Sequence, residues 1–339
     1  MTEDYWPDIS ASIPATFGSW DTKTRREEYP ITRLRSRYNA SGPWFKGALH
    51  CHTTASDGRL SLDELVSLYR AQGFDFLCVT DHQRFSRVDG MHPSGLLLLD
   101  GVEAHCPLGR HRWAHVIGIG ISGGDEMLRG GLHTVCDNLR RAGAILVLGH
   151  PHWSDLRTQD LFAYRYDGIE IYSYGSYKDS GKAYGIAHWD LLLAEGYDTL
   201  GFAVDDVHAR PPLEDWCGGW VMVNAPRLDR RSIMAAIRRG CFYSSNGPEI
   251  HRLHVRRGKV ELETSPISIV RLIGFNGFAA ALQLPQGRKS RRLVLPLPSR
   301  RVLASKWRYV RLELEDARGK VAWTNTLFRV STAGRRITI

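Results

Sequence analysis

Seven short apolar runs between residues 46 and 204 constrain the fold of this chain more than any other feature. They lie at 46–50, 74–80, 96–99, 116–121, 144–148, 168–172 and 199–204. Helical patterns separate several of them, at 62–69, 132–141 and 183–195, and Ser61 with Glu64 forms a capping box before the first. Apolar strands that alternate with amphipathic helices are typical of parallel strands covered by helices. We therefore predict an α/β fold built on a seven-stranded (β/α) barrel.

The pattern changes after residue 226. One helix is predicted over 230–239, ending at Gly240, and short alternating runs such as 310–315 and 321–327 follow it. Turn residues at 257–258, 276–277 and 317–319 indicate hairpins, so we expect a smaller all-β, sandwich-like C-terminal domain. The predicted division is a leader at 1–44 that packs on the surface, the barrel at 45–226, and a helix with a basic β domain at 227–339.

Charge and histidine are distributed in opposite ways along the chain. Residues 1–226 hold 21 Lys and Arg against 29 Asp and Glu, whereas residues 227–339 hold 24 against 7. Twelve of the 14 histidines lie between His50 and His208, and imidazole is the commonest side-chain ligand of transition metals. We therefore expect the chemistry in the acidic, histidine-rich part. The basic part could follow a nucleic-acid backbone, but its scattered arginines favour a solvated or docked face.

Composition indicates the compartment. No apolar stretch reaches the 18 or so residues that a membrane-spanning helix needs, and the N-terminus lacks the basic and apolar regions of a signal peptide. The six cysteines form no C-x-x-C pair, in a chain large enough to fold without disulfides. We expect a cytoplasmic protein with no membrane partner.

Histidines and carboxylates stand at the ends of the predicted strands. They are His50 and His52 after the first strand, His82 after the second, Glu103 after the third, His115 at the start of the fourth, His150 after the fifth, and Asp206 and His208 after the seventh. The carboxyl ends of parallel barrel strands meet at one mouth, and the side chains of an H-x-H pair point the same way, with Cys51 facing away. One histidine at a strand end is usually a hydrogen-bonded structural residue. So many ionisable groups together require compensating cations, so a metal centre is predicted.

These motifs together resemble the polymerase and histidinol phosphatase (PHP) superfamily. They are the run Lys46-Gly-Ala-Leu-His50-Cys-His52-Thr-Thr-Ala-Ser-Asp57-Gly58, the Thr80-Asp81-His82 element, Glu103, His115, His150 and the Asp206-Val-His208 element. The resemblance covers residues 46–208 and implies a distorted seven-stranded barrel with two to three divalent ions, Zn²⁺, Mn²⁺ or Fe. Residues 242–249 and 322–325 are similar to the carbaryl-hydrolase-like branch of that superfamily.

The resemblance also implies how the ligands are shared among the ions. The first ion would be held by His50, His52, Glu103 and Asp206, the second by Asp57, His82 and His208, and the third by Glu103, His115 and His150. One position departs from the pattern, because Asp57 stands where some relatives carry a histidine.

The predicted chemistry is hydrolysis. Imidazole and carboxylate ligands suit zinc, manganese or iron, and the lack of thiolate ligands argues against a closed structural zinc site. Adjacent divalent ions lower the pKa of a bound water and spread the charge of the transition state. We expect a metal-dependent phosphoesterase in which metal-bound hydroxide at a di- or trinuclear site attacks a phosphate monoester or a small phosphodiester. The predicted catalytic residues are His50, His52, Glu103, Asp206 and His208.

Three alternatives remain open at the level of the sequence. A carbamate or carboxylic ester hydrolase is favoured by the similarity of the C-terminal residues, and a non-catalytic nucleic-acid-binding module by the basic β domain. An amidohydrolase would also begin with H-x-H, but the Thr80-Asp81-His82 element and the pair of Asp206 and His208 favour the phosphoesterase type.

Substrate contacts are predicted near the strand ends. Arg84 lies two residues past His82, Arg112 precedes His115, Lys178 follows the sixth strand, and His152 follows Pro151. The cations could pair with phosphate oxygens, although each could equally be a solvated loop charge. His152 could line the pocket or protonate a leaving group. No phosphate-binding glycine loop occurs, so a nucleotide cofactor is not expected.

Overall fold

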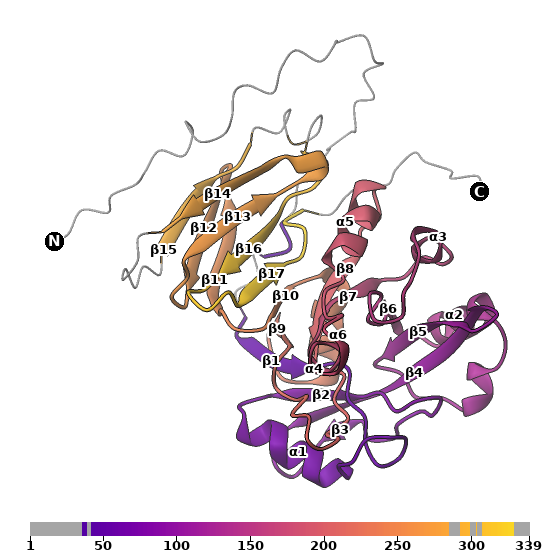
Figure 1. Ribbon diagram of the computed structural model, residues 1–339. Coiled ribbons are helices and arrows are strands. Elements are labelled where there is room, and N and C mark those ends of the chain that lie inside the picture. Colours follow the sequence, from indigo (N-terminus) through magenta and orange to yellow (C-terminus); the bar gives the residue numbers. More distant parts are fainter. Residues whose placement is uncertain (1–35, 39–41, 285–291, 299–302, 304–306, 329–339) are drawn as a thin grey trace.

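The computed structural model describes residues 36–38, 42–284, 292–298, 303 and 307–328. The protein is a mixed α/β fold built on one large sheet and a separate three-stranded sheet (Figure 1). The seven predicted apolar runs form strands of the large sheet, in the spatial order β1 (Trp44–Ala48), β2 (Phe76–Val79), β4 (Leu97–Gly109), β5 (Arg112–Ile119), β6 (Ile145–Leu148), β7 (Gly168–Ser173) and β8 (Leu200–Val204). A two-residue strand, β3 (Gly90–Met91), pairs with the start of β4.

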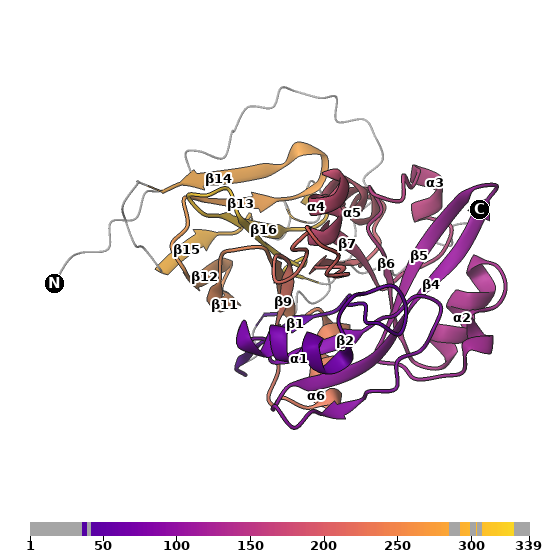
Figure 2. The ribbon, with the colours of Figure 1, turned by 60° about the horizontal axis from the view of Figure 1, so that its bottom comes forward.

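The direction of β5 differs from the prediction. The pairs β1·β2, β2·β4, β6·β7 and β7·β8 are parallel, but β5 runs antiparallel to both β4 and β6. Only two residues separate β4 from β5, and so short a turn can join only antiparallel strands. Figure 2 shows the two strands as a long hairpin. Glu103 consequently lies within β4 rather than at its end, and His115 is the fourth residue of β5 rather than the first.

The first and last of these strands approach each other only at their carboxyl ends. The isolated parallel bridge between Cys51 and Val207 joins the segments that follow β1 and β8. The N–H of His52 donates to the carbonyl of Val207 over 3.1 Å, and the N–H of Asp206 donates to the carbonyl of His50 over 3.1 Å. On the edge away from β2, β1 also pairs antiparallel with β9 (Trp220–Asn224), which pairs with β10 (Phe242–Ser245). This bridge brings the first and the last predicted ligand pairs together.

Helices flank the strands and close the inner core. They are α1 (Leu62–Ala71), α2 (Leu132–Arg141), α3 (Thr158–Leu161), α4 (Tyr174–Ser180), α5 (Ile186–Ala194) and α6 (Arg230–Arg239), with 3-10 turns η2 (Asp125–Leu128) and η3 (Phe275–Gly277). The capping box predicted at Ser61 is present, and α6 ends at Gly240 in the left-handed conformation (φ 70°). The buried face of α6, with Ile233 and Ile237, packs against strand residues such as Phe202 in one apolar cluster.

The large sheet continues through the boundary predicted near residue 226. The remaining strands are β11 (Ile250–Arg256), β12 (Lys259–Thr264), β13 (Ile269–Ile273), β14 (Ala279–Gln283), β15 (Arg292–Pro296), β16 (Arg311–Glu315) and β17 (Val321–Thr324). Strands β14, β13, β16 and β17 extend the large sheet beyond β10, while β11, β12 and β15 form the separate sheet. The two layers share an apolar core that includes Val260, Leu272 and Leu314. All three predicted hairpins are present.

Part of the predicted leader lies within the described chain. Tyr38 is buried, its hydroxyl donates to the carbonyl of Phe242, and the N–H of Asn325 donates to that hydroxyl. Tyr38 is therefore part of the core, and Trp44 begins β1, whereas residues 1–35 and 39–41 of the predicted leader lie outside the described residues. All six cysteines are free thiols. No helix in the described part of the chain is long and apolar enough to cross a membrane.

Candidate metal centre

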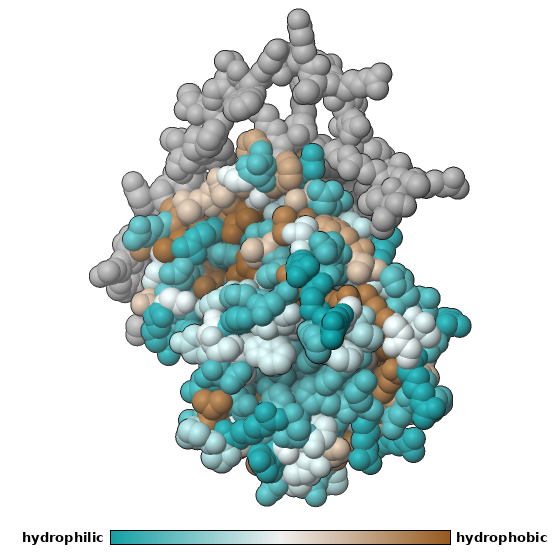
Figure 3. Space-filling view, turned by 45° about the vertical axis from the view of Figure 1, so that its right-hand side comes forward, coloured by the Kyte–Doolittle hydropathy of each residue, from teal (hydrophilic) through white to brown (hydrophobic). Residues whose placement is uncertain are grey.

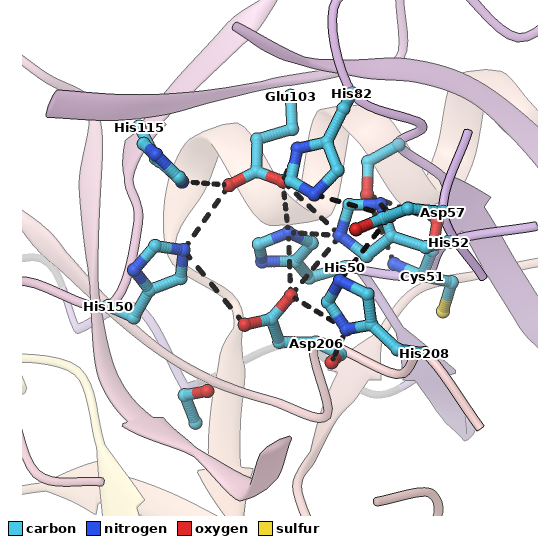
Figure 4. A network of polar contacts seen from close by, with 12 residues as sticks. His50, Cys51, His52, Asp57, His82, Glu103, His115, His150, Asp206 and His208 are labelled. Atoms are coloured by element: carbon cyan, nitrogen blue, oxygen red, sulfur yellow. Dashed lines mark hydrogen bonds and ion pairs between the residues drawn. The ribbon is translucent and has the colours of Figure 1, made fainter. Parts of the chain in front are cut away.

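Side chains from seven separate segments converge at the carboxyl ends of β1, β2, β6 and β8 and on the facing part of the β4–β5 hairpin (Figure 4). They are the nine predicted ligands, His50, His52, Asp57, His82, Glu103, His115, His150, Asp206 and His208. Their donor atoms fall into overlapping groups, and within each group the atoms lie within 4.8 Å of one another. Three of these groups contain the three ligand sets that the family resemblance implies.

The innermost group consists of His50, His52, Glu103 and Asp206. Nε2 of His50 and Nε2 of His52 are 3.1 Å apart, and each lies 3.2 Å from Oδ1 of Asp206 and from Oε2 of Glu103. The side chain of Cys51 instead belongs to the apolar cluster formed with α1. The period of two along an extended chain therefore separates the two imidazoles from the thiol, as predicted.

The outer group opens to solvent. Oδ1 of Asp57 lies 3.4 Å from Nε2 of His82, 3.5 Å from Nε2 of His208 and 3.9 Å from Nδ1 of His52. The Asp57 side chain is 41% exposed, whereas those of His52 and Glu103 are fully buried. A ligand from solution can therefore reach the centre from this side.

Glu103 connects the inner group to the third. Its Oε1 lies 2.7 Å from Nδ1 of His115 and 3.2 Å from Nε2 of His150, while its Oε2 faces the imidazoles of the inner group. Figure 4 shows the carboxylate between His115 and His150 on one side and His50 and His82 on the other. One carboxylate thus presents its two oxygens to two different sets of donors.

Two buried side-chain atoms that lack hydrogen-bond partners indicate that a metal ion fits this arrangement. Among the described residues, Nδ1 of His52 and Oε2 of Glu103 are buried without a hydrogen-bond partner. Oε2 of Glu103 has the ring nitrogens of His50, His52 and His82 within 3.2 Å, but none is in hydrogen-bonding geometry. Buried polar atoms are nearly always satisfied. The lone pair of Oε2 of Glu103 lies toward the inner imidazoles and that of Nδ1 of His52 toward Asp57, so each could be satisfied by a metal ion at its own position.

The metal-free centre is strongly coupled electrostatically. Burial acts to raise the pKa of the Glu103 carboxyl, but the charge of His50 and the hydrogen bond from His115 hold it well below its usual range. Burial acts to lower the pKa of His52, but the hydrogen bond to Asp206 and the nearby carboxylate charge of Glu103 raise it to about 9. The pKa of His50 is also raised, since the carboxylates of Asp206 and Glu170 outweigh its burial. Protons therefore occupy the site where cations would bind.

Two further residues of the centre are missing from the sequence prediction. Oε1 of Glu170, in β7, accepts from Nδ1 of His50 over 2.8 Å, and Oε2 accepts from the backbone N–H of His150 over 2.7 Å. His105, in β4, lies with Nε2 2.7 Å from Nδ1 of His82 and stacks on His115 at 4.2 Å. A glutamate inside an apolar run, and a histidine two residues after Glu103, are the signals that could have identified them.

Two carboxylates of the strand-end motifs are directed away from the cluster. Asp81 accepts from the N–H and hydroxyl of Thr53 and the hydroxyl of Ser56, so it holds the loop that carries Asp57. Asp205 accepts from the hydroxyl of Tyr69 and from the N–H groups of residues 217–219. Burial raises the pKa of Asp205 to about 6, although these hydrogen bonds act to lower it.

The predicted substrate contacts are placed less favourably than the ligands. Arg112 forms an ion pair with Asp160, which also accepts from the N–H of Arg157, so its guanidinium is already committed. Arg84 and His152 are exposed. The ammonium of Lys178 lies over the Tyr174 ring, 5.7 Å from its centroid.

Arg210, which was not predicted, contacts a member of the centre directly. It pairs with Oδ2 of Asp57, whose Oδ1 faces the histidines. Arg210 and Arg59 line a cleft of about 500 Å³ beside Asp57, together with Thr54, Ser56 and Gly58. Cationic groups therefore lie next to the solvent-open side of the centre.

The fold and the site define a mixed α/β protein with a candidate metal centre built from histidines and carboxylates. No protein-family model matches the chain. Two curated proteins are similar to parts of it: a 5'-3' exoribonuclease of Haemophilus influenzae, 39% identical over 75 residues (21% of this chain, 27% of the relative), and a 3',5'-nucleoside bisphosphate phosphatase of Chromobacterium violaceum, 30% identical over 106 residues (29% and 37%). The chain thus matches only about a third of the length of either relative.

One solved structure aligns with most of the chain. It is a two-domain protein of Bacteroides vulgatus containing a predicted PHP-like metal-dependent phosphoesterase. The alignment covers 90% of this chain and 99% of that one, with 15% identity and a TM-score of 0.49.

Proposed function

We propose that the protein is a metal-dependent phosphoesterase of the PHP type that hydrolyses a phosphate monoester or a small phosphodiester. One observation carries this proposal. The two oxygens of the buried Glu103 face two separate sets of imidazoles, 2.7 to 3.2 Å away, and the solvent-open Asp57 group completes a third set. The similarity of parts of the chain to an exoribonuclease and a bisphosphate phosphatase supports the same chemistry.

The residues present would hold two or three divalent ions, and Zn²⁺, Mn²⁺ or Fe suits their imidazole and carboxylate donors. Such ions supply Lewis acidity toward phosphoryl oxygens and lower the pKa of a water molecule at the site. Glu103 and Asp206 provide the negative charge that balances them. Glu170 fixes the orientation of His50 by accepting from its Nδ1–H, so that Nε2 faces the cluster.

The charges around the opening favour phosphate over a neutral ester. Arg210 and Arg59 line the cleft next to Asp57, and a guanidinium can bind two oxygens of a phosphate at once. A carbamate or carboxylic ester offers no comparable negative charge in its ground state. We therefore place the carbaryl-hydrolase type of reaction second.

Metal content and a substrate panel test the proposal. Protein purified without chelator should contain at least about two equivalents of transition metal per chain. With added Mn²⁺ it should hydrolyse nitrophenyl phosphate or bis-nitrophenyl phosphate faster than a naphthyl carbamate. Asp206→Ala should abolish turnover, whereas His133→Ala, on the exposed surface of α2, should not. Turnover of the carbamate alone, or protein without bound metal, would overturn the proposal.

A further inference from the structure

Large aromatic side chains are exposed along one side of the candidate centre. Among the described residues, the large hydrophobic side chains left exposed include those of Trp113 (50%), Trp153 (41%) and Tyr177 (49%). Single exposed hydrophobics are common on protein surfaces, but several gathered beside one site indicate a binding surface. We call these three residues the aromatic rim.

Trp153 lies directly against two of the candidate ligands. Its ring centroid is 5.1 Å from that of His150, with the ring planes at 80°, and 5.9 Å from that of His115. Its Nε1–H donates to Oδ2 of Asp179 over 3.3 Å. Asp179 belongs to α4, the helix that also carries Tyr177. The tryptophan ring is thus held in place while two fifths of its side chain stays in contact with solvent.

Trp113 extends the same side outward along β5. The residues Ile117, His115 and Trp113 alternate along the strand and therefore share one of its faces. Ile117 is buried in the inner core, His115 is a candidate ligand, and Trp113 is half exposed. This face therefore runs from the core, through the centre, to an aromatic side chain at the surface.

The opposite side of the opening has a different chemistry. The aromatic rim adjoins the donor set of Glu103, His115 and His150, whereas Arg59 and Arg210 adjoin the set that contains Asp57. A substrate lying across the centre would meet cations at one end and aromatic rings at the other. Phosphate oxygens suit the first end, and a planar ring suits the second.

We propose that the aromatic rim binds a planar aromatic ring, carried by the substrate next to the scissile ester, as an aryl group or a nucleobase. This inference rests on the proposed phosphoesterase function and narrows its substrate class. Stacking on protein aromatic side chains is strong and tolerates different rings, because every aromatic ring has a π face. A substrate without a ring would leave the rim exposed and gain nothing from it.

The test measures preference among three phosphate esters with Mn²⁺ present: adenosine monophosphate, nitrophenyl phosphate and glycerol phosphate. For the wild type, kcat/KM should be higher for one or both ring-bearing esters than for glycerol phosphate. In Trp153→Ala and Trp113→Ala, the ratio of ring-bearing to ringless kcat/KM should fall roughly tenfold to a hundredfold. Trp153→Phe should restore most of the preference, because it keeps a ring at the same position.

A matched control separates stacking from a general loss of exposed surface. Met91 is 54% exposed but lies in β3, paired with Leu97 at the start of β4, whereas Glu103 lies in the middle of β4, so Met91→Ala should leave the ratio unchanged. A drop confined to adenosine monophosphate identifies a nucleobase, and a drop for nitrophenyl phosphate identifies an aryl group. Equal losses for all three esters, or no loss in either tryptophan variant, would overturn the inference.

Binding distinguishes failure of this inference from failure of the proposed function. If the wild type hydrolyses none of the three esters, the phosphoesterase proposal fails. Dissociation constants for the same compounds, from quenching of tryptophan fluorescence, then decide the inference. Tighter binding of the ring-bearing compounds that is lost in Trp153→Ala supports it, and equal binding of all three refutes it.

Discussion

The inner and outer parts of the candidate centre use the same residue types in opposite environments. The inner part, His50, His52, Glu103 and Asp206, is almost entirely buried, and among the described residues one side-chain atom each of His52 and Glu103 has no hydrogen-bond partner. The outer part, Asp57, His82 and His208, is partly exposed and shares its carboxylate with Arg210. Charge in the inner part must be compensated for the protein to be stable, whereas water can compensate it in the outer part.

The acidic half of the chain, residues 1–226, and the basic half, residues 227–339, also differ in where their charged side chains lie. On the face shown in Figure 3, hydrophobic residues gather mainly in the upper part, where β11–β17 lie, and the lower part around the strand ends is mostly hydrophilic. The acidic half gathers its buried histidines and carboxylates at one internal point. The basic half carries its charge on many separate surface pairs, such as Arg271 with Glu315, and these contribute little individually.

The largest effect is expected from Glu103→Gln. The substitution removes the carboxylate that faces two donor sets, so more than one metal equivalent should be lost and turnover should fall at least about a thousandfold. Positively charged neighbours would remain buried without their partner, so the free energy of unfolding should fall by about 3 kcal/mol or more. Metal analysis and denaturant titration measure both, with the exposed Glu195→Gln as control. Full metal content in Glu103→Gln would refute the shared-carboxylate arrangement.

The next largest effect compares the inner and outer parts directly. His52→Ala and Asp206→Ala should each abolish turnover with most of the fold intact, because the strands are stabilised by their apolar cores. Asp57→Ala should cost a single metal equivalent and leave the inner ions bound, since the inner donors remain. Turnover, metal per chain and circular dichroism measure this. If Asp57→Ala emptied the whole centre, the two parts would not be separable.

A third expectation concerns pH in the metal-free protein. The pKa of His52 is about 9 in the folded chain, above the 6.5 of a free histidine, because the hydrogen bond to Asp206 and the carboxylate charge of Glu103 outweigh burial. A raised pKa contributes stability that is fully present below pH 6.5 and is lost as pH rises through 9. Metal-free protein should therefore lose stability between these limits, by an amount on the order of a few kcal/mol.

The metal-loaded protein should behave in the opposite way. Ligands must lose their protons to bind a cation, so metal affinity should rise over the same interval and binding should release protons into a weak buffer. Unfolding curves with and without chelator, at pH 6.5 and 9, provide the comparison. If the stability of the metal-free and the metal-loaded protein changed with pH in the same way, the protonated imidazoles would not occupy the metal positions.

Much of this arrangement could be predicted because the signals are local. The period of two places His50 and His52 together and directs Cys51 away, and strand-end positions brought the remaining ligands to one edge. The direction of β5 could not be predicted from its apolar run, because hydrophobicity has no polarity along the chain. The short turn before Arg112 contained that information. As a result, Glu103 was expected at a strand end, although it lies within a strand.

Other features depend on contacts between residues far apart in the chain. Glu170 lies 120 residues from His50 and Arg210 lies 153 from Asp57, and no local pattern connects either pair. Arg112 was predicted as a substrate contact on its proximity to His115 alone. The structure pairs it with Asp160, 48 residues away, a contact that the local sequence does not indicate. The convergence of the candidate ligands could therefore be predicted, whereas the residues that orient or neutralise them could not.

A smaller effect is expected from Glu170→Gln, which keeps the size of the side chain but weakens its hydrogen bond from His50. Residues that orient metal ligands typically contribute tenfold to a hundredfold in metal affinity. Titration of metal-free protein with Zn²⁺ should show weaker binding of that order at the inner part, with the outer part unaffected. Unchanged affinity would mean that packing alone orients His50.

The smallest effect is expected from Arg210→Gln, and it tests whether the outer part is as independent as its exposure implies. Arg210 is 50% exposed and Asp57 41%, so their ion pair contributes only about 0 to 1 kcal/mol. Metal affinity of the outer part should change by less than about fivefold in Arg210→Gln. Removing the guanidinium removes its repulsion of a metal ion, but it also frees Oδ2 of Asp57, so the change can have either sign. The KM for a phosphate ester should rise, since the cleft loses one of its two arginines.

Arg227→Gln, which removes an exposed arginine paired with Asp229 before α6, is the matched control. A thousandfold loss of turnover in Arg210→Gln would instead make this arginine part of the reacting centre, and the distinction between a buried inner part and a water-compensated outer part would no longer hold.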